Sequence, residues 1–552
     1  MLLSFACFLW VLTSLGTYKT TLIPFQGGVL REGIVGTPRF INPLLAATAA
    51  DRDMTALVYS GLMRIGADGT LTSDLAESVT ISDDGLIYNI ILKQGLVFHD
   101  GTPITSDDVL FTIVKAQDPV LKSPRRGDWE GVKTERIGDY EFNILLPEPY
   151  APFVENLTLG ILPRHVWEFS TSEEMPFNLH NTEPIGSGAY TISHIQKNES
   201  GVPESYTLKP FKEHTPYEAH IKKLVLTFFT NEETLVAALL RKEIDSAASL
   251  SAPSLEKILH GEHADAFTLH RSPLPRTFVL FFNQNENPAF RDIAVRKALD
   301  ASIDREAIVS ETLGGYGLPV SGPIPPGFGF ETTYQPATGT LARIDTARDI
   351  LRAGGWKVNE ETNLWEKKEG EDIVSLKLSI ATINTPSFES TATILQRTWA
   401  ELGVPVDIKK FEQSDFTQTV IRPRKYETML FGTAVGRDLD FYSFWHSSQR
   451  TDPGLNVALY ANITTDSILA TARTNMNEEE RERTILRFAE ELATDLPALF
   501  LYVPEFTYVT PNNIQNIAFP GIAGPYERFS RIEEWYTETE AVWPLFTKKD
   551  NQ

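Results

Sequence analysis

The sequence predicts an α/β fold in which strands and helices are mixed and several folding units follow one another. The chain has 552 residues, of which 42% are hydrophobic and 22% charged, so it can fill several cores and lacks the composition of a disordered protein. At about 150 residues per domain, three or four units are expected. Strand-type and helix-type patterns alternate along the chain, which is typical of α/β and α+β units.

Three apolar segments predict strands. "KLVLTFF" (223–229) and "TFVLFFN" (277–283) are uninterrupted apolar runs, which are typical of strands buried on both faces. Leu376, Leu378 and Ile380 alternate with polar residues, which predicts a half-buried strand.

Helical spacing is clearest near the C-terminus. Ile485, Phe488 and Leu492 recur at helical intervals behind the charged run 478–483, and Asn477 stands where an N-cap is expected. The sequence therefore predicts a helix that begins after Asn477, with a solvated first turn.

The segment 81–113 combines turn and cap signals. Asp100-Gly101 predicts a tight turn, and Thr105 with Asp108 resembles a capping box. His99 and Asp100 could also form an acid/base pair. We favour the structural interpretation, because each of these residues already has a place in a turn or cap.

Charge and cysteine content exclude several classes of function. The chain carries 50 basic and 73 acidic residues, a net charge of −23, which repels phosphate backbones, so we expect no nucleic-acid partner. Cys7 is the only cysteine, so disulfides, thiolate metal sites and cysteine catalysis are not expected in the folded part.

The first eighteen residues, Met1 to Tyr18, carry no charge and predict a membrane anchor or a signal peptide. Phe5 stands where a lipidation site at Cys7 would need a small residue, so lipidation is not expected. We therefore expect an extracytoplasmic protein, periplasmic or on the cell surface, either tethered by this segment or secreted.

Enzymatic and metal-binding functions find little support in the motifs. There is no His-Glu-x-x-His or Gly-x-Ser-x-Gly, and Gly186-Ser187-Gly188 lacks the spacing of a nucleophile elbow. The histidines of "HGEHADAFTLH" (260–270) could share a metal, but Gly261 and the absence of apolar periodicity favour a solvated loop after a helix. We expect no catalysis, no metal site and no cofactor.

Five segments, in order along the chain, resemble one known family, the extracytoplasmic solute-binding proteins of peptide and nickel ABC importers, called solute-binding family 5. The segments are "GIVGTPRFINPLLAATAADRDMTALVYSGLMRIGADGTLTSDLAES" (33–78), "FHDGTPITSDDVLFT" (98–112), "EPIGSGAYTI" (183–192), "FNQNENPAFRDIAVRKALDASIDREAIV" (282–309) and "ATDLPALFLY" (493–502).

The resemblance implies a two-lobed periplasmic-binding-protein type II fold with an extra inserted domain, in which the lobes close over a ligand. The crossover strands would be 277–283 and 499–506. The implied parts are an N-terminal anchor or signal segment with a linker at 1–27, a first lobe at 28–58, 180–274 and 505–552, an inserted domain at 59–179 and a second lobe at 275–504.

The resemblance also points to a ligand site in "GRDLDFYSFWHSS" (436–448), which is similar to the family's Asp-Pro-Asp segment. It implies that Asp438 faces the interlobe cavity and pairs with the α-ammonium of a peptide, with Leu439 in place of the proline. Asp440 could be a second ligand contact or a local cap. Arg437 could pair with Asp438 or Asp440, or meet a peptide carboxylate.

The aromatic residues of this segment have two interpretations. Tyr442 and Trp445 could line the pocket or pack in the core, and His446 is the residue there that would suit nickel, although a lone histidine is usually structural. The candidate ligand-binding residues are Asp438, Asp440, Arg437, Tyr442, Trp445 and His446.

The function implied is that of the substrate-binding component of an ABC importer, which captures short peptides and delivers them to permease subunits. We expect a monomer that is not an enzyme. A binder of nickel, a metal chelate or another small solute on the same fold is the alternative, and a sensory receptor or a hydrolase is less favoured.

Overall fold

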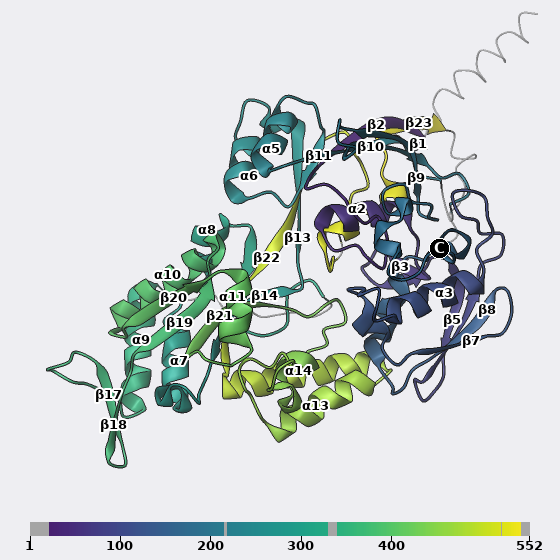
Figure 1. Ribbon diagram of the computed structural model, residues 1–552. Coiled ribbons are helices and arrows are strands. Elements are labelled where there is room, and N and C mark those ends of the chain that lie inside the picture. Colours follow the sequence, from purple (N-terminus) through teal and green to yellow (C-terminus); the bar gives the residue numbers. More distant parts are fainter. Residues whose placement is uncertain (1–20, 215–217, 329–338, 520, 543–552) are drawn as a thin grey trace, which may run out of the picture.

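The computed structural model describes residues 21–214, 218–328, 339–519 and 521–542. Strands and helices are mixed throughout, as expected, and they form two lobes (Figure 1). We call residues 21–273 with 505–542 the first lobe and residues 276–504 the second lobe. Within the first lobe, residues 59–179 are called the insert.

One sheet of twelve strands runs through both lobes. Its main path is β20-β19-β21-β14-β22-β12-β2-β11-β10-β9, with β13 and β15 paired to β22. The strands are β2 (Gly27–Val35), β9 (Tyr190–Lys197), β10 (Pro203–Pro210), β11 (Ile221–Phe229), β12 (Ser246–Ala248), β13 (Phe267–Pro273), β14 (Arg276–Phe282), β15 (Gly317–Pro319), β19 (Leu378–Ile383), β20 (Val406–Phe411), β21 (Thr428–Ala434) and β22 (Ala498–Pro511).

β22 belongs to both lobes. Its first half pairs antiparallel with β14 and β15 of the second lobe, and its second half pairs with β13 and β12 of the first lobe. The chain therefore passes between the lobes along β22 and at the short connection from β13 to β14. The segments expected to cross, 277–283 and 499–506, lie in β14 and β22.

Two of the strand predictions need correction in their burial. β19 is buried along its whole length, not half-buried, because it lies between β20 and β21 and packs against helix α10 (Pro386–Leu402). β11 is not buried on both faces, since Lys222 and Lys223 are exposed and its last three residues are partly exposed. β14 is mostly buried, as predicted.

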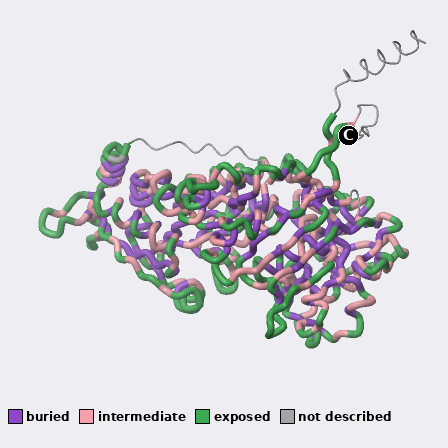
Figure 2. The backbone as a smooth tube through the Cα atoms, turned by 90° about the horizontal axis from the view of Figure 1, so that it is seen from above, coloured by how far each residue is buried: buried purple, intermediate pink, exposed green. Residues whose placement is uncertain are grey.

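The insert forms two small antiparallel sheets and a helix. They are β3 (Met63–Ile65) with β4 (Leu71–Ser73), β5 (Ala76–Ile81), β6 (Ile87–Leu92), β8 (Glu141–Leu145) and β7 (Lys133–Arg136), and α3 (Ser106–Gln117). α3 begins at the predicted capping box of Thr105 and Asp108. Buried side chains of the insert and of much of the rest of the first lobe form one cluster, and a second, smaller cluster lies in the same lobe at residues 235–258 with Val509. Figure 2 shows buried segments in both lobes.

Helices cover the sheets of both lobes (Figure 1). They are α2 (Ala49–Val58), α4 (Arg164–Trp167), α5 (Glu232–Leu240), α6 (Ala252–Leu259), α7 (Ile293–Ala301), α8 (Arg305–Leu313), α9 (Thr340–Ala353), α10 (Pro386–Leu402), α11 (Gln413–Phe416), α12 (Tyr442–Trp445), α13 (Ile463–Thr474) and α14 (Glu478–Asp495). α14 is the predicted C-terminal helix, and the side chain of Asn477 accepts the N–H of Glu480 at 3.0 Å.

Two peripheral sheets complete the fold. A hairpin sheet of β16 (Lys357–Val358), β17 (Trp365–Glu369) and β18 (Asp372–Ser375) projects from the second lobe, and β1 (Thr21–Phe25) pairs with β23 (Glu538–Val542) near the two ends of the described chain. Within the described ranges, no helix has the length and hydropathy needed to span a bilayer. The predicted anchor, residues 1–18, lies outside the described residues.

Candidate functional site

The loop between β21 and α12 carries the predicted acidic residues. Two residues in it have left-handed backbones, Gly436 with φ of 71° and Leu439 with φ of 53°. Proline cannot adopt that conformation, because its ring fixes φ near −65°. The loop therefore differs from an Asp-Pro-Asp loop at Leu439, and this turn sends Asp438 and Asp440 to different partners.

Asp438 has the most perturbed carboxyl group of the loop. Among the described residues its carboxylate forms no ion pair, and the backbone N–H groups that stabilise it are its own and that of Asp440. Burial, followed by the negative charges of Asp440 and Glu155, raises the pKa of Asp438 to about 8. Asp438 borders a cavity of about 10 Å³, lined also by Pro152, Arg473 and other residues of α13 and α14, which is room for about one water.

Asp440, in contrast, is fully paired. Arg473 at the end of α13 donates to its carboxylate from Nε at 2.9 Å and from Nη2 at 2.6 Å. Tyr150 of the insert donates its hydroxyl at 3.1 Å, and the N–H of Tyr442 donates at 3.1 Å. Asp440 thus acts as a local cap and also joins the second lobe to the insert.

Arg437 turns away from both aspartates and reaches the other lobe. Its guanidinium donates to the carbonyl oxygen of Gly521 and to the carboxylate of Glu527, and it reaches the carbonyl oxygen of Gly69 at 3.1 Å. Its Nε lies 3.7 Å from Oε2 of Glu155. From the sequence, Asp438 and Asp440 were the possible partners of Arg437 within the loop, and in the structure Arg437 pairs with neither of them.

The three aromatic candidates lie in different surroundings. Trp445 is 2% exposed and packs against Phe281 and Phe500 in the core of the second lobe. Tyr442 is partly exposed and stacks on His446 with ring centroids 4.0 Å apart, while the guanidinium of Arg473 lies 4.1 Å from its ring centroid. Of Trp445 and Tyr442, only Tyr442 has an exposed surface that a ligand could contact.

His446 has local structural partners. Its Nδ1 lies 2.8 Å from Oγ of Ser448 and accepts the N–H of Ser448 at 3.1 Å, and Nε2 lies 3.9 Å from Asp466. No group of three or more metal-ligating side chains was found in the described part of the chain. The histidines of 260–270 are separated as well: His260 ends α6, and His270 lies in β13, where it contacts Thr510 at 3.0 Å. The last four residues of that segment, 267–270, thus lie in a strand and not in the loop expected.

His99 supports a neighbouring loop. Its Nε2 lies 3.0 Å from the carbonyl oxygen of Gly188, and the N–H of Gly186 points at Nδ1 from 3.4 Å. Burial lowers the pKa of His99 to about 4, so the ring is neutral at pH 7. Asp100 does not pair with it but with His165, at 2.7 Å.

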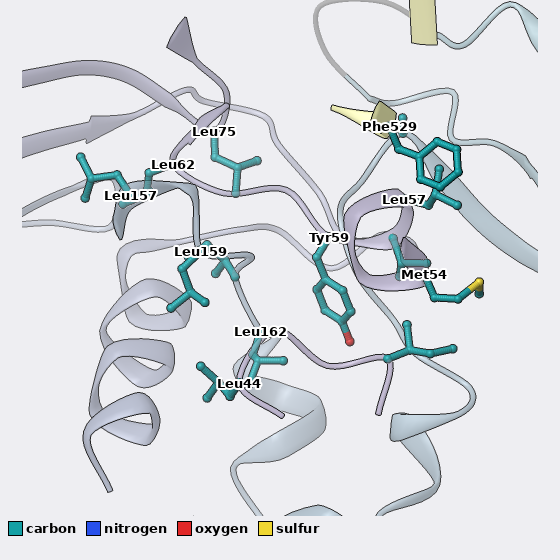
Figure 3. Close-up of a cluster of buried hydrophobic side chains, with 14 of the residues drawn as sticks. Leu44, Met54, Leu57, Tyr59, Leu62, Leu75, Leu157, Leu159, Leu162 and Phe529 are labelled. Carbon is teal, nitrogen blue, oxygen red and sulfur yellow. The ribbon is translucent and has the colours of Figure 1, made fainter. Parts of the chain in front are cut away.

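A larger cavity of about 210 Å³ lies in the first lobe, between α2, the insert and the C-terminal segment. Its walls include Tyr59, Leu159 and Phe529, which Figure 3 shows among buried apolar side chains. Polar residues that line the cavity include Asp74, His214, Glu533, Arg52, Arg125, Tyr526 and Glu527. Glu527 is the same residue that meets Arg437 of the second lobe.

Four residues of this region were not predicted from the sequence, namely Tyr150, Glu155, Arg473 and Glu527. Tyr150 and Asp440 are 290 positions apart, and Arg437 and Glu527 are 90 apart. No local pattern marks any of the four, because each acts through a partner brought close only by the fold.

Comparison with known proteins agrees with this architecture. The model of the bacterial extracellular solute-binding proteins, family 5, matches residues 70–454. The oligopeptide-binding protein AppA of Bacillus subtilis is 26% identical over 526 residues, covering 93% of this chain and 92% of AppA. The glutathione-binding protein GsiB of Pectobacterium atrosepticum is 24% identical over 490 residues, covering 84% of this chain and 86% of GsiB.

Solved structures share the whole fold. The ABC transporter substrate-binding protein CtaP of Listeria monocytogenes has a TM-score of 0.76 and 25% identity, covering 93% of this chain and all of CtaP. NikZ of Campylobacter jejuni, solved with Ni(L-His), has a TM-score of 0.68 and 25% identity, covering 92% of this chain and 99% of NikZ. The resemblance found in the sequence is confirmed, and so is its two-lobed fold. The chain belongs to the bacterial extracellular solute-binding proteins of family 5.

Proposed function

We propose that this chain captures short peptides between its two lobes and delivers them to the permease of an ABC importer. The proposed place of action is outside the cytoplasmic membrane, with residues 1–18 as the tether and the chain acting as a monomer. AppA of Bacillus subtilis, a relative over 93% of the chain, is named as oligopeptide-binding and has been solved with a nonapeptide. Family membership supports binding and transport, and no enzymatic step is proposed.

The observation that carries the proposal is the carboxylate of Asp438. It is partly buried next to the carboxylates of Glu155 and Asp440. Of the two aspartates, Asp438 and Asp440, only Asp440 pairs with a guanidinium group. A peptide ammonium would supply the missing positive charge through charge-assisted hydrogen bonds, which fix the end of a peptide without reading its side chains. We assign the cavity of the first lobe to ligand side chains, with Tyr442 as a further contact.

Binding of a peptide mixture to the exported part of the chain tests the proposal, by native mass spectrometry and thermal shift. A peptide at about 100 times its dissociation constant should stabilise the protein by roughly 2.7 kcal/mol. Binding of a nickel chelate and of no peptide would replace the peptide assignment with a metal one.

The Asp438→Asn variant tests the site itself. Because hydrogen bonds to charged groups contribute about 1.5–3 kcal/mol, peptide affinity should fall at least about tenfold. His99→Ala is the control, since it removes support from the loop at Gly186 and should lower the melting temperature while leaving affinity nearly unchanged. Equal affinity in Asp438→Asn and the parent protein would remove Asp438 from the site.

A further inference from the structure

Arg437 joins the two lobes directly. It stands on the second lobe, and its hydrogen-bond acceptors are the carboxylate of Glu527 and the carbonyl oxygens of Gly521 and Gly69, all on the first lobe. The Arg437 and Glu527 side chains are only 10% and 12% exposed. Charge-assisted hydrogen bonds shielded from water in this way are stronger than surface ion pairs.

The acceptor side of this contact is held rigidly. The N–H of Ala523 donates to Oε2 of Glu527 at 2.8 Å. The next residue, Arg528, is buried in the first lobe, where it pairs with Glu32 at 3.0 Å and with Asp53 at 2.7 Å. Glu527 is therefore presented to the second lobe by a segment anchored in the core of the first.

A second contact between the lobes lies three residues further along the same loop. Asp440 accepts the hydroxyl of Tyr150, and the guanidinium of Arg473 lies 5.3 Å from the Tyr150 ring centroid. Helix α13 also packs against residues 151–158 of the insert. Asp438 thus lies between two residues, Arg437 and Asp440, that each hold the opposite lobe.

We infer that Arg437 and Glu527 form a latch that holds the lobes together through protein contacts alone. Every bond of the latch joins two protein atoms, so no ligand is needed to bridge the lobes. Glu527 also lines the cavity of the first lobe, so the latch lies at the edge of that cavity. The inference concerns how closure is controlled, beyond which ligand is bound.

The latch has a distinctive kinetic consequence. If it holds most of the unliganded molecules closed, ligand must wait for opening, and the observed association rate is reduced by the closed fraction. Removing the latch then speeds association and dissociation together, while the dissociation constant changes little. A contact that formed only after ligand had bound would instead slow dissociation and leave association unchanged.

Distances between spin labels test the latch without any ligand. Cys7 is the only cysteine of the chain, so a Cys7→Ser background can carry labels at Ser200→Cys in the first lobe and Lys409→Cys in the second, both exposed positions. Pulsed electron paramagnetic resonance should give one dominant distance for the parent. Arg437→Gln and Glu527→Gln should each add a longer one, and the double variant should open no further than Arg437→Gln alone, because Arg437 is the donor of every bond of the latch.

Arg397→Gln is the matched control, because Arg397 pairs with Glu311 at 2.9 Å on the exposed surface within the second lobe. It should leave the distance distribution unchanged. Circular dichroism and melting temperature establish that each variant is folded, and Glu527→Gln tests the same pair from the other lobe if Arg437→Gln does not fold. Identical distributions in the parent and a folded latch variant would overturn the inference.

Stopped-flow binding of the peptide found by mass spectrometry is the second measurement, and this part rests on the proposed function. The latch variants should associate severalfold faster and dissociate faster by a similar factor. Unchanged association with faster dissociation would overturn the latch as a feature of the unliganded protein. If no peptide binds at all, the proposed function fails, while the label distances still decide the latch.

Discussion

At the scale of single residues, the backbone of the loop at 436–440 determines what each acidic side chain can do. Gly436 and Leu439 both have positive φ values, a conformation that favours glycine and costs other residues energy. With this geometry Asp440 faces Arg473 and Tyr150, whereas Asp438 is left among carboxylates. Two aspartates separated by one residue therefore have opposite electrostatic surroundings.

Gly436→Ala should disturb Asp438 in particular. A Cβ at position 436 would lie 2.8 Å from Oδ1 of Asp438, closer than carbon and oxygen tolerate, and the left-handed backbone adds about 1–2 kcal/mol. We expect a lower melting temperature and weaker peptide binding, measured by thermal unfolding and calorimetry. Gly432→Ala, in the strand β21 that leads into this loop, is the control, since its nearest neighbour would be 3.9 Å away. Equal behaviour of the two variants would contradict this account of the loop.

At the scale of elements, the short helix at Pro525–Phe529 connects the core of the first lobe to the second lobe. Tyr526 lines the cavity, Glu527 meets Arg437, and Arg528 pairs with two buried carboxylates. The alternation of roles along three neighbouring residues follows from the tight turn of this helix, which points successive side chains in different directions.

Arg528→Met should strongly destabilise the protein. Arg528 and Glu32 are 1% and 0% exposed, and removing the cation leaves the carboxylates of Glu32 and Asp53 without their partner. Breaking a buried ion pair by removing one member typically costs about 3–5 kcal/mol, which a shift of the urea unfolding midpoint would reveal. Arg397→Met, at a side chain 59% exposed, should cost less than about 1 kcal/mol. A midpoint for Arg528→Met equal to that of the control would contradict a stabilising role for the buried ion pairs.

At the scale of the whole molecule, contact between the lobes brings together more carboxylates than cations. Arg437 pairs with Glu527 and Arg473 pairs with Asp440. Burial raises the pKa values of Asp438, Glu155 and Glu527. Burial, with the charges of Asp440 and Glu155, raises the pKa of Asp438 to about 8. Burial raises the pKa of Glu155 to about 7; the charge of Arg437 lowers this pKa, and the charge of Glu527 raises it. Three groups of the surrounding elements face Asp438. They are the guanidinium groups of Arg473 in α13 and Arg481 in α14, and the hydroxyl of Tyr150 in the insert.

Closure should therefore take up protons. In an open molecule these carboxyl groups meet water and titrate near their ordinary values of about 4, so between about pH 4 and pH 8 the closed form binds more protons than the open form. The closed fraction should fall as pH rises through this range, which label distances at pH 5, 7 and 9 would measure. Asp438→Asn should reduce the pH dependence, because the amide does not titrate. A closed fraction that rises with pH would contradict the prediction.

Local patterns predicted elements better than their surroundings. The helix after Asn477, the capping box at Thr105 and the strand at 277–283 depend on periodicity and caps, which the sequence contains in full. The burial of β19 and β11 was predicted wrongly, because it depends on which strands and helices lie next to each of them. The lobe boundaries and the ligand contacts of the site residues stay predictions.

The sequence by itself determined the family, the mixed α/β class and the loop in which an acidic ligand site is expected, because these are carried by motifs of neighbouring residues. Only the tertiary structure decided which aspartate has a partner, that Arg437 reaches Glu527 across the lobes, and that Trp445 packs in the core. The physical reason is that charge pairing and burial depend on distances in space, and the fold brings together residues as far apart in the sequence as Glu32 and Arg528, which are 496 positions apart.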